Sequence, residues 1–321
     1  MSSNPKRHVL VIGGSGFVGG AVVRALLARG HEVTVLNRGS KPVAGAAQLV
    51  ADRNDPEAVE DALLARAFDV MIDTNCYTGE QAAIMIAATE GKVRRALVIS
   101  SAAVYGNSAR MPPTEDEPIG GATVWSPYGQ NKSKVEDAYR AARQFGSCVI
   151  VRPPYVFGPN NNFERERWVW ARQLNNRPVL IPGNGRSRVQ FLHEDDLGDV
   201  VEMLSCGMRM GVEVFNVADR QIVTLSELVS MLAWIAGCED RQYAVGDKAD
   251  GAAARSWFPF RDYPVQTDPT RLLEETSWTP PLGLAERFEE TFAALSPDEL
   301  RASMKPNDTE LAIAAKLGAD S

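Results

Sequence analysis

The stretch from Val9 to Gly20 constrains the fold of this chain more than any other. Four apolar residues, Val9 to Ile12, run directly into a cluster of glycines, and an apolar run suited to a helix, Ala21 to Ala28, follows at once. This pattern predicts a buried strand, a tight turn and the first turn of a helix. The backbone N–H groups of such a turn and the start of the helix can approach a pyrophosphate. The stretch therefore predicts a dinucleotide-binding site.

The alternation of strands and helices continues through the first half of the chain. Further strands are predicted at residues 32–38, 48–53, 68–74, 96–101 and 148–153, with a helix over 79–91. We also expect Asp55 and Ser126 to cap helices, each with a proline in the first helical position. Near-continuous apolar strands are typical of parallel sheets covered on both faces. The predicted fold class is α/β, a doubly wound parallel sheet of the Rossmann type.

The predicted elements are shorter in the second half of the chain, where prolines and glycines separate them beyond residue 159. Helices are predicted near residues 164–175, 195–204, 225–235 and 270–275, and an amphipathic stretch lies at 311–317. We expect a dinucleotide-binding domain at residues 1–158 and a smaller α/β substrate-binding lobe at 159–321. Residues from about 189 to 204 are expected to return to the first domain.

Composition and charge narrow the choice of partners. A net charge of −7 argues against a nucleic-acid-binding surface, because phosphate backbones require a basic face. No apolar run approaches the roughly 20 residues of a membrane span, and the N-terminal residues lack the apolar core of a signal peptide. The four cysteines and three histidines show no ligand spacing, which predicts free thiols and no metal site. We expect a cytoplasmic protein that binds small molecules, and neither nucleic acid nor membranes.

The residues that end the second predicted strand, Asn37 and Arg38, bear on the choice of cofactor. They lie about twenty residues past the glycines, where a dinucleotide fold binds the adenosine ribose. An acid at this position selects NAD, whereas an arginine suits the 2′-phosphate of NADP. The local pattern favours NADP, although a solvated loop arginine explains Arg38 as well, and a reaction that returns its hydride would suit tightly bound NAD. Asp52, at the end of the third strand, is placed to reach the adenine edge.

Tyr128 and Lys132 are the strongest candidates for chemistry. A spacing of four residues puts both on one face of a helix, and a neighbouring ammonium stabilises a phenolate. Such a tyrosine can act as a general base and acid. Ser101 ends a central strand and therefore faces the ligand crevice at the carboxyl edge of the sheet. Its hydroxyl could bond a substrate hydroxyl or carbonyl and share the proton with Tyr128.

Several motifs together resemble the extended short-chain dehydrogenases/reductases, in particular the NAD-dependent epimerase/dehydratase family. The matching residues are Gly13-x-x-Gly16-x-x-Gly19, Ser101 ahead of Val104-Tyr105-Gly106, Tyr128-x-x-x-Lys132, Arg152 to Pro159, Arg188 to Asp196, Phe215 to Ala218 and Ser277 to Pro280. These motifs extend over most of the chain, which makes the resemblance specific.

The resemblance implies a role for each matching position. Tyr128 would be the catalytic acid and base, Lys132 would hold the nicotinamide ribose, and Ser101 would complete the catalytic set. The other implied NAD- or NADP-binding residues are Gly13, Ser15, Gly16, Phe17, Val18, Gly19, Asn37, Arg38, Asp52, Arg53, Thr74 and Pro154. The implied substrate contacts are Cys76, Ser101, Ala102, Tyr128, Tyr155, Asn161 and Arg188. Relatives contact substrate phosphates at the position of Arg188, and many of them form homodimers.

Two departures from the family pattern bear on the reaction. Asp73-Thr74-Asn75-Cys76 replaces the usual His-Leu-Ala-Ala, and with Asn37-Arg38-Gly39 it resembles an atypical branch that includes the chloroplast stem-loop RNA-binding proteins. Ala102-Ala103 stands where sugar 4,6-dehydratases carry an Asp-Glu pair. Without that pair, elimination would need Tyr128 or Cys76 as its proton donor, and Cys76 is more simply explained as a buried thiol.

Two classes of function follow from these observations. The first is an enzyme that forms a transient ketone on a nucleotide-activated sugar or related nucleoside and epimerises it, with elimination or net keto-reduction as alternatives. The second is a non-catalytic NAD(P)- or RNA-binding protein of the atypical branch. The intact Ser101, Tyr128 and Lys132 and the acidic charge balance favour the enzyme.

Overall fold

The computed structural model describes residues 5–106, 110–207 and 209–319 of the 321-residue chain. The chain forms two compact units. The first unit comprises residues up to 156 together with 192–218 and 267–279, and the second comprises 157–191, 219–266 and the residues from 280 onwards. The segment that returns to the first unit is therefore longer than the predicted 189–204, and a second segment returns as well. No helix within the described ranges is both long and apolar enough to cross a membrane.

A parallel sheet forms the centre of the first unit. In spatial order its strands are β10 (Gly211–Asn216), β6 (Ser147–Arg152), β5 (Arg95–Ile99), β4 (Val70–Asp73), β1 (His8–Ile12), β2 (Glu32–Asn37) and β3 (Ala47–Val50). The predicted parallel sheet and its first six strands are confirmed, and the edge strand β10 is an addition. The strand order reverses between β1 and β4, which is where doubly wound sheets open a ligand crevice at their carboxyl ends.

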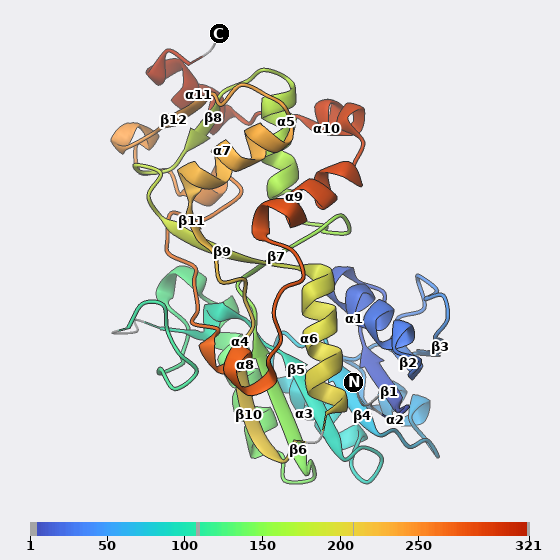
Figure 1. Cartoon of the computed structure of the whole chain (residues 1–321). Coiled ribbons are helices and arrows are strands. Elements are labelled where there is room, and N and C mark those ends of the chain that lie inside the picture. Colours follow the sequence, from blue (N-terminus) through green and yellow to red (C-terminus); the bar gives the residue numbers. More distant parts are fainter. Residues whose placement is uncertain (1–4, 107–109, 208, 320–321) are drawn as a thin grey trace. The chain divides into compact units, whose positions relative to one another are not determined.

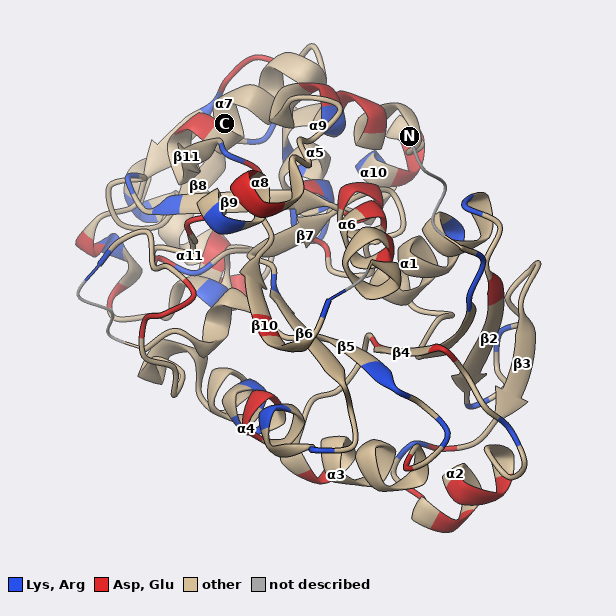
Figure 2. Ribbon diagram, turned by 60° about the horizontal axis from the view of Figure 1, so that its bottom comes forward, with Lys and Arg blue, Asp and Glu red and all other residues tan. Residues whose placement is uncertain are grey.

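Helices cover both faces of this sheet, as Figure 2 shows. On one face lie α1 (Phe17–Ala28) and α6 (Glu194–Cys206), and on the other lie α2 (Pro56–Ala62), α3 (Gly79–Ala88) and α4 (Tyr128–Ala141). Val9 and Val11 pack in the core under α1 and α6, whereas Leu10 and Ile12 pack in the core under α2, α3 and α4. Because both faces are buried, β1 needs apolar side chains at successive positions, and this is why its sequence does not alternate.

The beginnings of two helices test the predicted caps. Asp55 caps α2 as expected, since its carboxylate accepts the Ala58 N–H at 3.1 Å and Pro56 is the first helical residue. The prediction for α4 is wrong by one position. This helix begins at Tyr128, Pro127 is the residue before it, and no side chain caps it. The hydroxyl of Ser126 bonds the side chain of Gln130 instead, at 3.3 Å.

The second unit is built from shorter elements around an aromatic core. They are α5 (Glu166–Leu174), β8 (Val179–Ile181), β11 (Ile222–Thr224), α7 (Leu225–Ile235), β12 (Gln242–Ala244), α9 (Leu284–Ala293), α10 (Pro297–Ser303) and α11 (Asp308–Leu317), while β7 (Tyr155–Phe157) and β9 (Arg188–His193) carry the chain between the units (Figure 1). Phe288 stacks on Phe157 at 4.0 Å between ring centroids and meets Phe191 edge-on at 5.5 Å. A buried pair between Arg172 and Glu310, with both contacts at 2.6 Å, ties α11 to α5.

Candidate active site

The glycine turn after β1 leaves no room for a side chain at Gly13 or Gly19. Gly13 has a φ of +85°, and its carbonyl oxygen accepts the Gly16 N–H at 3.2 Å. A Cβ atom at Gly19 would lie only 2.2 Å from that same carbonyl oxygen. The exposed Gly16 is the residue before α1, and Ser15, Phe17 and Val18 flank it, half-buried. The turn thus leaves backbone N–H groups at the start of a helix, the geometry that binds a pyrophosphate.

The residue predicted to lie beside the adenosine ribose, Asn37, has a fixed amide orientation. Its Oδ1 accepts hydrogen bonds from the Gly39 N–H and from the Gln48 Nε2, both at 2.8 Å. Because backbone N–H groups only donate, Oδ1 must face Gly39, and Nδ2 is then left buried with no acceptor among the described residues. Asn37 therefore offers an unpaired donor where NAD-selective folds offer an acid. Arg38 beside it is exposed.

The two residues that end the third predicted strand have different surroundings. Asp52 is exposed and accepts both the N–H and the Nδ2 of Asn54, and the backbone bond lowers the pKa of its carboxyl. The guanidinium of Arg53 turns inward instead, where it forms a buried pair with both carboxylate oxygens of Asp73, at 2.7 and 2.9 Å. The Arg53 guanidinium thus joins the segments that follow β3 and β4. The contacts predicted for Asp52 and Arg53 with adenine stay predictions.

The residues after β4 close against the glycine turn. The Thr74 hydroxyl donates to the Ile12 carbonyl oxygen at 2.7 Å. Asn75 accepts from Arg53 at 2.8 Å, and its side chain fills the space beside Gly13, where a Cβ atom would lie 2.5 Å away from it. Asp73 also accepts the phenol of Tyr139 at 2.8 Å. The unusual segment from Asp73 to Asn75 is thus fitted to the glycine turn.

The predicted proton-transfer residues lie at two places. Ser101 follows the carboxyl end of β5, and Tyr128 and Lys132 lie in the first turns of α4. Ser101 precedes a short 3-10 helix, η1 (Ala102–Val104), and its hydroxyl accepts the Ala103 N–H at 3.2 Å. Lys132 is buried, and its ammonium donates to the Ile99 carbonyl oxygen at 2.8 Å and lies 6.0 Å from the centre of the Tyr128 ring. The structure therefore brings Tyr128 and Lys132 together next to the end of β5.

A glycine allows α4 and η1 to meet. A Cβ atom at Gly129, the residue after Tyr128, would lie 2.2 Å from the Ala103 carbonyl oxygen. The first turn of α4 can press against η1 only because that atom is missing. This contact sets Tyr128 next to the turn that carries Ser101.

A buried network of charged and polar groups supports this end of the site. Glu136 lies one helical turn beyond Lys132 and accepts two hydrogen bonds from Arg152, at 2.9 and 2.7 Å. Glu136 also accepts the Ser100 hydroxyl at 2.6 Å, and Arg152 donates to the Tyr105 phenol at 2.9 Å. Burial acts to lower the pKa of Arg152, but the hydrogen bonds and charge of Glu136 outweigh it and the pKa rises. The network keeps α4, β5 and β6 in register beneath the candidate catalytic residues.

The predicted substrate contacts are spread over both units. In the first unit Ala102 and Tyr155 are buried, and Tyr155 packs edge-on against Trp125 at 6.4 Å between ring centroids. Pro154, which was predicted to contact the cofactor, is buried beside Tyr155. The thiol of Cys76 is closed off from solvent and contacts the Thr78 carbonyl oxygen at 3.6 Å, and burial raises its pKa to about 12. These surroundings confirm the buried thiol and do not favour Cys76 as a substrate contact or proton donor.

Asn161 and Arg188 belong to the second unit. The buried Asn161 accepts the Phe163 N–H at 2.9 Å and donates to the carboxylate of Glu166 at 3.2 Å. Arg188 begins β9 and is exposed. The side chain of Asn161 is therefore engaged within its own loop, whereas Arg188 is accessible.

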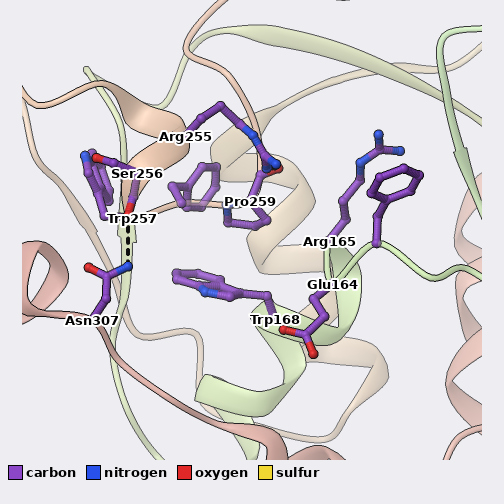
Figure 3. A pocket seen from close by; sticks show the side chains of 10 residues that line it. Glu164, Arg165, Trp168, Arg255, Ser256, Trp257, Pro259 and Asn307 are labelled. Carbon is purple, nitrogen blue, oxygen red and sulfur yellow. Dashed lines mark hydrogen bonds between the residues drawn. The ribbon is translucent and has the colours of Figure 1, made fainter. Parts of the chain in front are cut away.

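The described residues of the second unit include the linings of at least two hollows. One, of about 200 Å³, is shown in Figure 3, in which a dashed line marks the hydrogen bond from Asn307 to the Ser256 carbonyl oxygen. Among its lining residues, Trp168 meets Phe258 edge-on, with 5.6 Å between the ring centroids. The other, of about 710 Å³, is lined by residues around Gly183, Gly246 and Asp262. Neither Asn161 nor Arg188 lines them.

Sequence reasoning missed three contributors to the site: Asn75 beside Gly13, Glu136 beneath Lys132, and Tyr77. The ring of Tyr77 lies 5.3 Å from the Lys132 ammonium and is half-exposed. The i, i+4, i+8 spacing of Tyr128, Lys132 and Glu136 on one helical face could have revealed Glu136. No comparable sequence signal marks Tyr77 or Asn75, because their contacts cross between elements.

The chain is similar to several characterised proteins. Chloroplast stem-loop binding protein of 41 kDa b from Arabidopsis thaliana is 25% identical over 309 residues, which cover 91% of this chain and 80% of that protein. The 2′-dehydrokanamycin reductase of Streptomyces kanamyceticus is 32% identical over 230 residues, which cover 69% of this chain and 64% of the reductase.

The fold recurs in a solved structure of dTDP-glucose 4,6-dehydratase from Bacillus anthracis in complex with NAD, with a TM-score of 0.74 and 16% identity over 89% of this chain and 96% of that one. The model of the NAD dependent epimerase/dehydratase family matches residues 9–218. This match spans more than half of the chain and includes the glycine turn, Ser101, Tyr128 and Lys132. The chain therefore belongs to the NAD-dependent epimerase/dehydratase family.

Proposed function

We propose that the protein is an NAD(P)-dependent enzyme that oxidises one carbon of a nucleotide-activated sugar, or a related nucleoside, to a transient ketone and epimerises it. The observation that carries this proposal is the arrangement of Tyr128 and the buried Lys132 ammonium at the end of β5, next to the turn of Ser101. The glycine turn and the unpaired amide donor of Asn37 fit a dinucleotide. Such a cofactor, when bound, supplies the hydride acceptor and donor.

The side chains at the end of β5 supply the proton transfers. Tyr128 removes the proton from the substrate hydroxyl as the carbon is oxidised and returns it when the ketone is reduced. Lys132 holds a positive charge 6.0 Å from the centre of the Tyr128 ring, beside the proposed site of proton transfer. The Ser101 hydroxyl hydrogen-bonds the substrate oxygen and orients it toward Tyr128.

The residues around this site favour epimerisation over elimination. Elimination of a hydroxyl group needs an acid that protonates it as it leaves. Ala102 and Ala103 carry no ionisable group, and the Cys76 thiol is buried with a raised pKa. Tyr128 would have to perform both proton transfers in an elimination.

The substitution Tyr128→Phe tests the proposed function. We expect turnover of the active substrate, found by screening UDP-, dTDP- and GDP-linked sugars with NAD and NADP, to fall by roughly 10²- to 10⁴-fold. Cofactor binding should be retained, because the ring stays in place. Unchanged turnover in this variant would contradict the assignment. A protein that binds the cofactor but turns over none of these compounds would support the alternative of a non-catalytic NAD(P)- or RNA-binding protein.

Net keto-reduction with NADP is the second candidate function. The buried Nδ2 of Asn37 and the exposed Arg38 favour it, because both can donate to a 2′-phosphate. The relative named 2′-dehydrokanamycin reductase adds support. The nucleotide released when the purified protein is denatured distinguishes the two candidates. Retained NAD would favour the redox-neutral epimerase, whereas an empty site and NADP-dependent turnover would favour the reductase.

The substitution Asn37→Asp tests the cofactor preference directly. An acid at this position should weaken NADP binding by tenfold or more, about 1.4 kcal/mol, because a carboxylate repels the 2′-phosphate. NAD binding should change less. Arg38→Ala should also weaken NADP more than NAD, as measured by titration calorimetry. Equal effects of both variants on the two nucleotides would remove the basis for an NADP preference.

A further inference from the structure

We propose that the hydroxyl group of Tyr77 donates a hydrogen bond to the substrate oxygen that reacts at Tyr128, so that two phenols serve one reacting centre. This inference rests on the proposed function. It assigns a role to the residue after Cys76, in the segment that departs from the usual family pattern.

The two phenols share one positive charge. The Lys132 ammonium lies 5.3 Å from the centre of the Tyr77 ring and 6.0 Å from the centre of the Tyr128 ring. Lys132 itself is buried and is anchored on the Ile99 carbonyl oxygen, so its position is fixed. Tyr77 comes from the segment after β4 and Tyr128 from the first turn of α4. The rings therefore approach the same ammonium from two different elements.

The backbone of Tyr77 is held in place while its side chain remains accessible. Its N–H donates to the Gln81 side chain at 2.8 Å, and the Thr78 hydroxyl caps α3 by accepting the Gln81 N–H at 3.2 Å. Cys76, the residue before it, is fully buried. Tyr77 has a relative exposure of 52%, and Tyr128 has one of 39%. Both rings can thus meet a ligand without rearrangement of the core.

The other residues of this segment already have fixed partners. Asp73 pairs with Arg53, Thr74 bonds the Ile12 carbonyl oxygen, and Asn75 packs beside Gly13. Tyr77, by contrast, carries its hydroxyl group on an exposed side chain beside Tyr128 and Lys132.

The surroundings of Tyr77 favour its neutral form. Burial and then the nearby Tyr128 raise the pKa of Tyr77. Because a phenol already titrates well above neutral pH, the raised pKa keeps Tyr77 protonated. A neutral phenol has a proton to donate in a hydrogen bond. It can stabilise negative charge on the substrate oxygen while Tyr128 carries out the proton transfer.

The substitution Tyr77→Phe tests the proposal, since it keeps the ring beside Lys132 and removes only the hydroxyl. We expect kcat to fall by roughly tenfold to a hundredfold, as for the loss of a hydrogen bond to a charged group. The Kd for the cofactor and the melting temperature should be unchanged. Tyr243→Phe, which alters an exposed tyrosine of β12, should leave kcat unchanged.

A wild-type kcat in Tyr77→Phe, or a higher KM with unchanged kcat, would overturn the proposal. If Tyr128→Phe also retained full turnover, the proposed function would itself fail. Loss of activity in Tyr128→Phe together with full activity in Tyr77→Phe would overturn only the inference about Tyr77.

A measurement without turnover tests the pairing of the two phenols. Tyrosinate absorbance is recorded against pH for Tyr128→Phe and for the Tyr77→Phe/Tyr128→Phe double variant, and their difference gives the titration of Tyr77. The same difference between wild type and Tyr77→Phe gives the titration of Tyr77 with Tyr128 present. We expect the midpoint for Tyr77 to be lower in the Tyr128→Phe background, because the charge of Tyr128 is then absent. Identical midpoints would show that the two phenols do not interact and would overturn the proposal.

Discussion

The two ends of the predicted dinucleotide site in the first unit are built by opposite means. At the glycine turn the geometry depends on missing side chains, since a Cβ atom at Gly19 would lie 2.2 Å from the Gly13 carbonyl oxygen. At the proton-transfer end the geometry depends on buried charges, where Lys132 bonds Ile99 and Glu136 pairs with Arg152.

The difference follows from what each end must do. A pyrophosphate is bound by backbone N–H groups, so the chain only has to expose them. Proton transfer requires a phenol and an ammonium at fixed positions, and a buried charge stays in place only when its hydrogen bonds are satisfied. We therefore expect small side-chain additions to damage the first end and charge removal to damage the second.

Glu136→Gln should have the largest effect on stability. It leaves the buried Arg152 guanidinium without its counter-charge, which costs about 3–5 kcal/mol in comparable buried pairs. Urea denaturation of the whole chain measures this loss in the free energy of unfolding. The double variant Glu136→Met/Arg152→Met, which removes both charges, should recover most of it. A loss below about 1 kcal/mol would show that the pair does not hold this end of the site.

Gly19→Ala should have the largest effect on cofactor binding. The added methyl group meets backbone atoms of Gly13 and Gly14 that cannot move independently of the turn. We expect the Kd for NAD or NADP to rise by roughly a hundredfold. Gly20→Ala is the matched control, because its nearest neighbour would be 3.7 Å away at the end of the Arg24 side chain. Equal Kd values for the two variants would show that cofactor binding does not depend on the missing side chain at Gly19.

Gly129→Ala examines a place where the proton-transfer end also depends on a missing side chain. A methyl group there meets the Ala103 carbonyl oxygen at 2.2 Å and should push the start of α4 away from η1. We expect kcat to fall by roughly tenfold or more, since a small displacement of Tyr128 misaligns the proton transfer. The Kd for the cofactor should change less than in Gly19→Ala. The reverse ranking would mean that this contact serves the dinucleotide rather than Tyr128.

The smallest effect is expected in the labelling of the cysteine thiols. This labelling reports whether solvent reaches the segment after β4. Cys76, Cys148 and Cys206 are buried, and burial raises the pKa of each thiol, whereas Cys238 is partly exposed. A thiol reagent such as Ellman's reagent should therefore label Cys238 first in the native protein and all four cysteines in denaturant. Rapid native labelling that disappears in Cys76→Ser would show that the segment after β4 is open.

Local patterns were sufficient where a single element carries the information. The apolar run before Gly13 predicted β1, and the Asp55-Pro56 pair predicted the start of α2 correctly. The spacing of Tyr128 and Lys132 predicted that they share a helical face. At the start of α4 the local pattern was misleading, because Ser126 bonds Gln130 four residues on instead of capping the helix. Prediction failed more widely where contacts join distant elements, as between Asn75 and Gly13.

Local sequence patterns are sufficient to predict the parallel sheet, the glycine turn and the shared helical face of Tyr128 and Lys132, because each rests on a period or spacing within one or two adjacent elements. The inward turn of Arg53 to Asp73 and the packing of Asn75 against Gly13 depend on tertiary contacts. The approach of Tyr77 and Tyr128 to one ammonium depends on them as well. These contacts join the ends of different strands and helices, and the register between such elements is set by packing of the whole core rather than by local propensity.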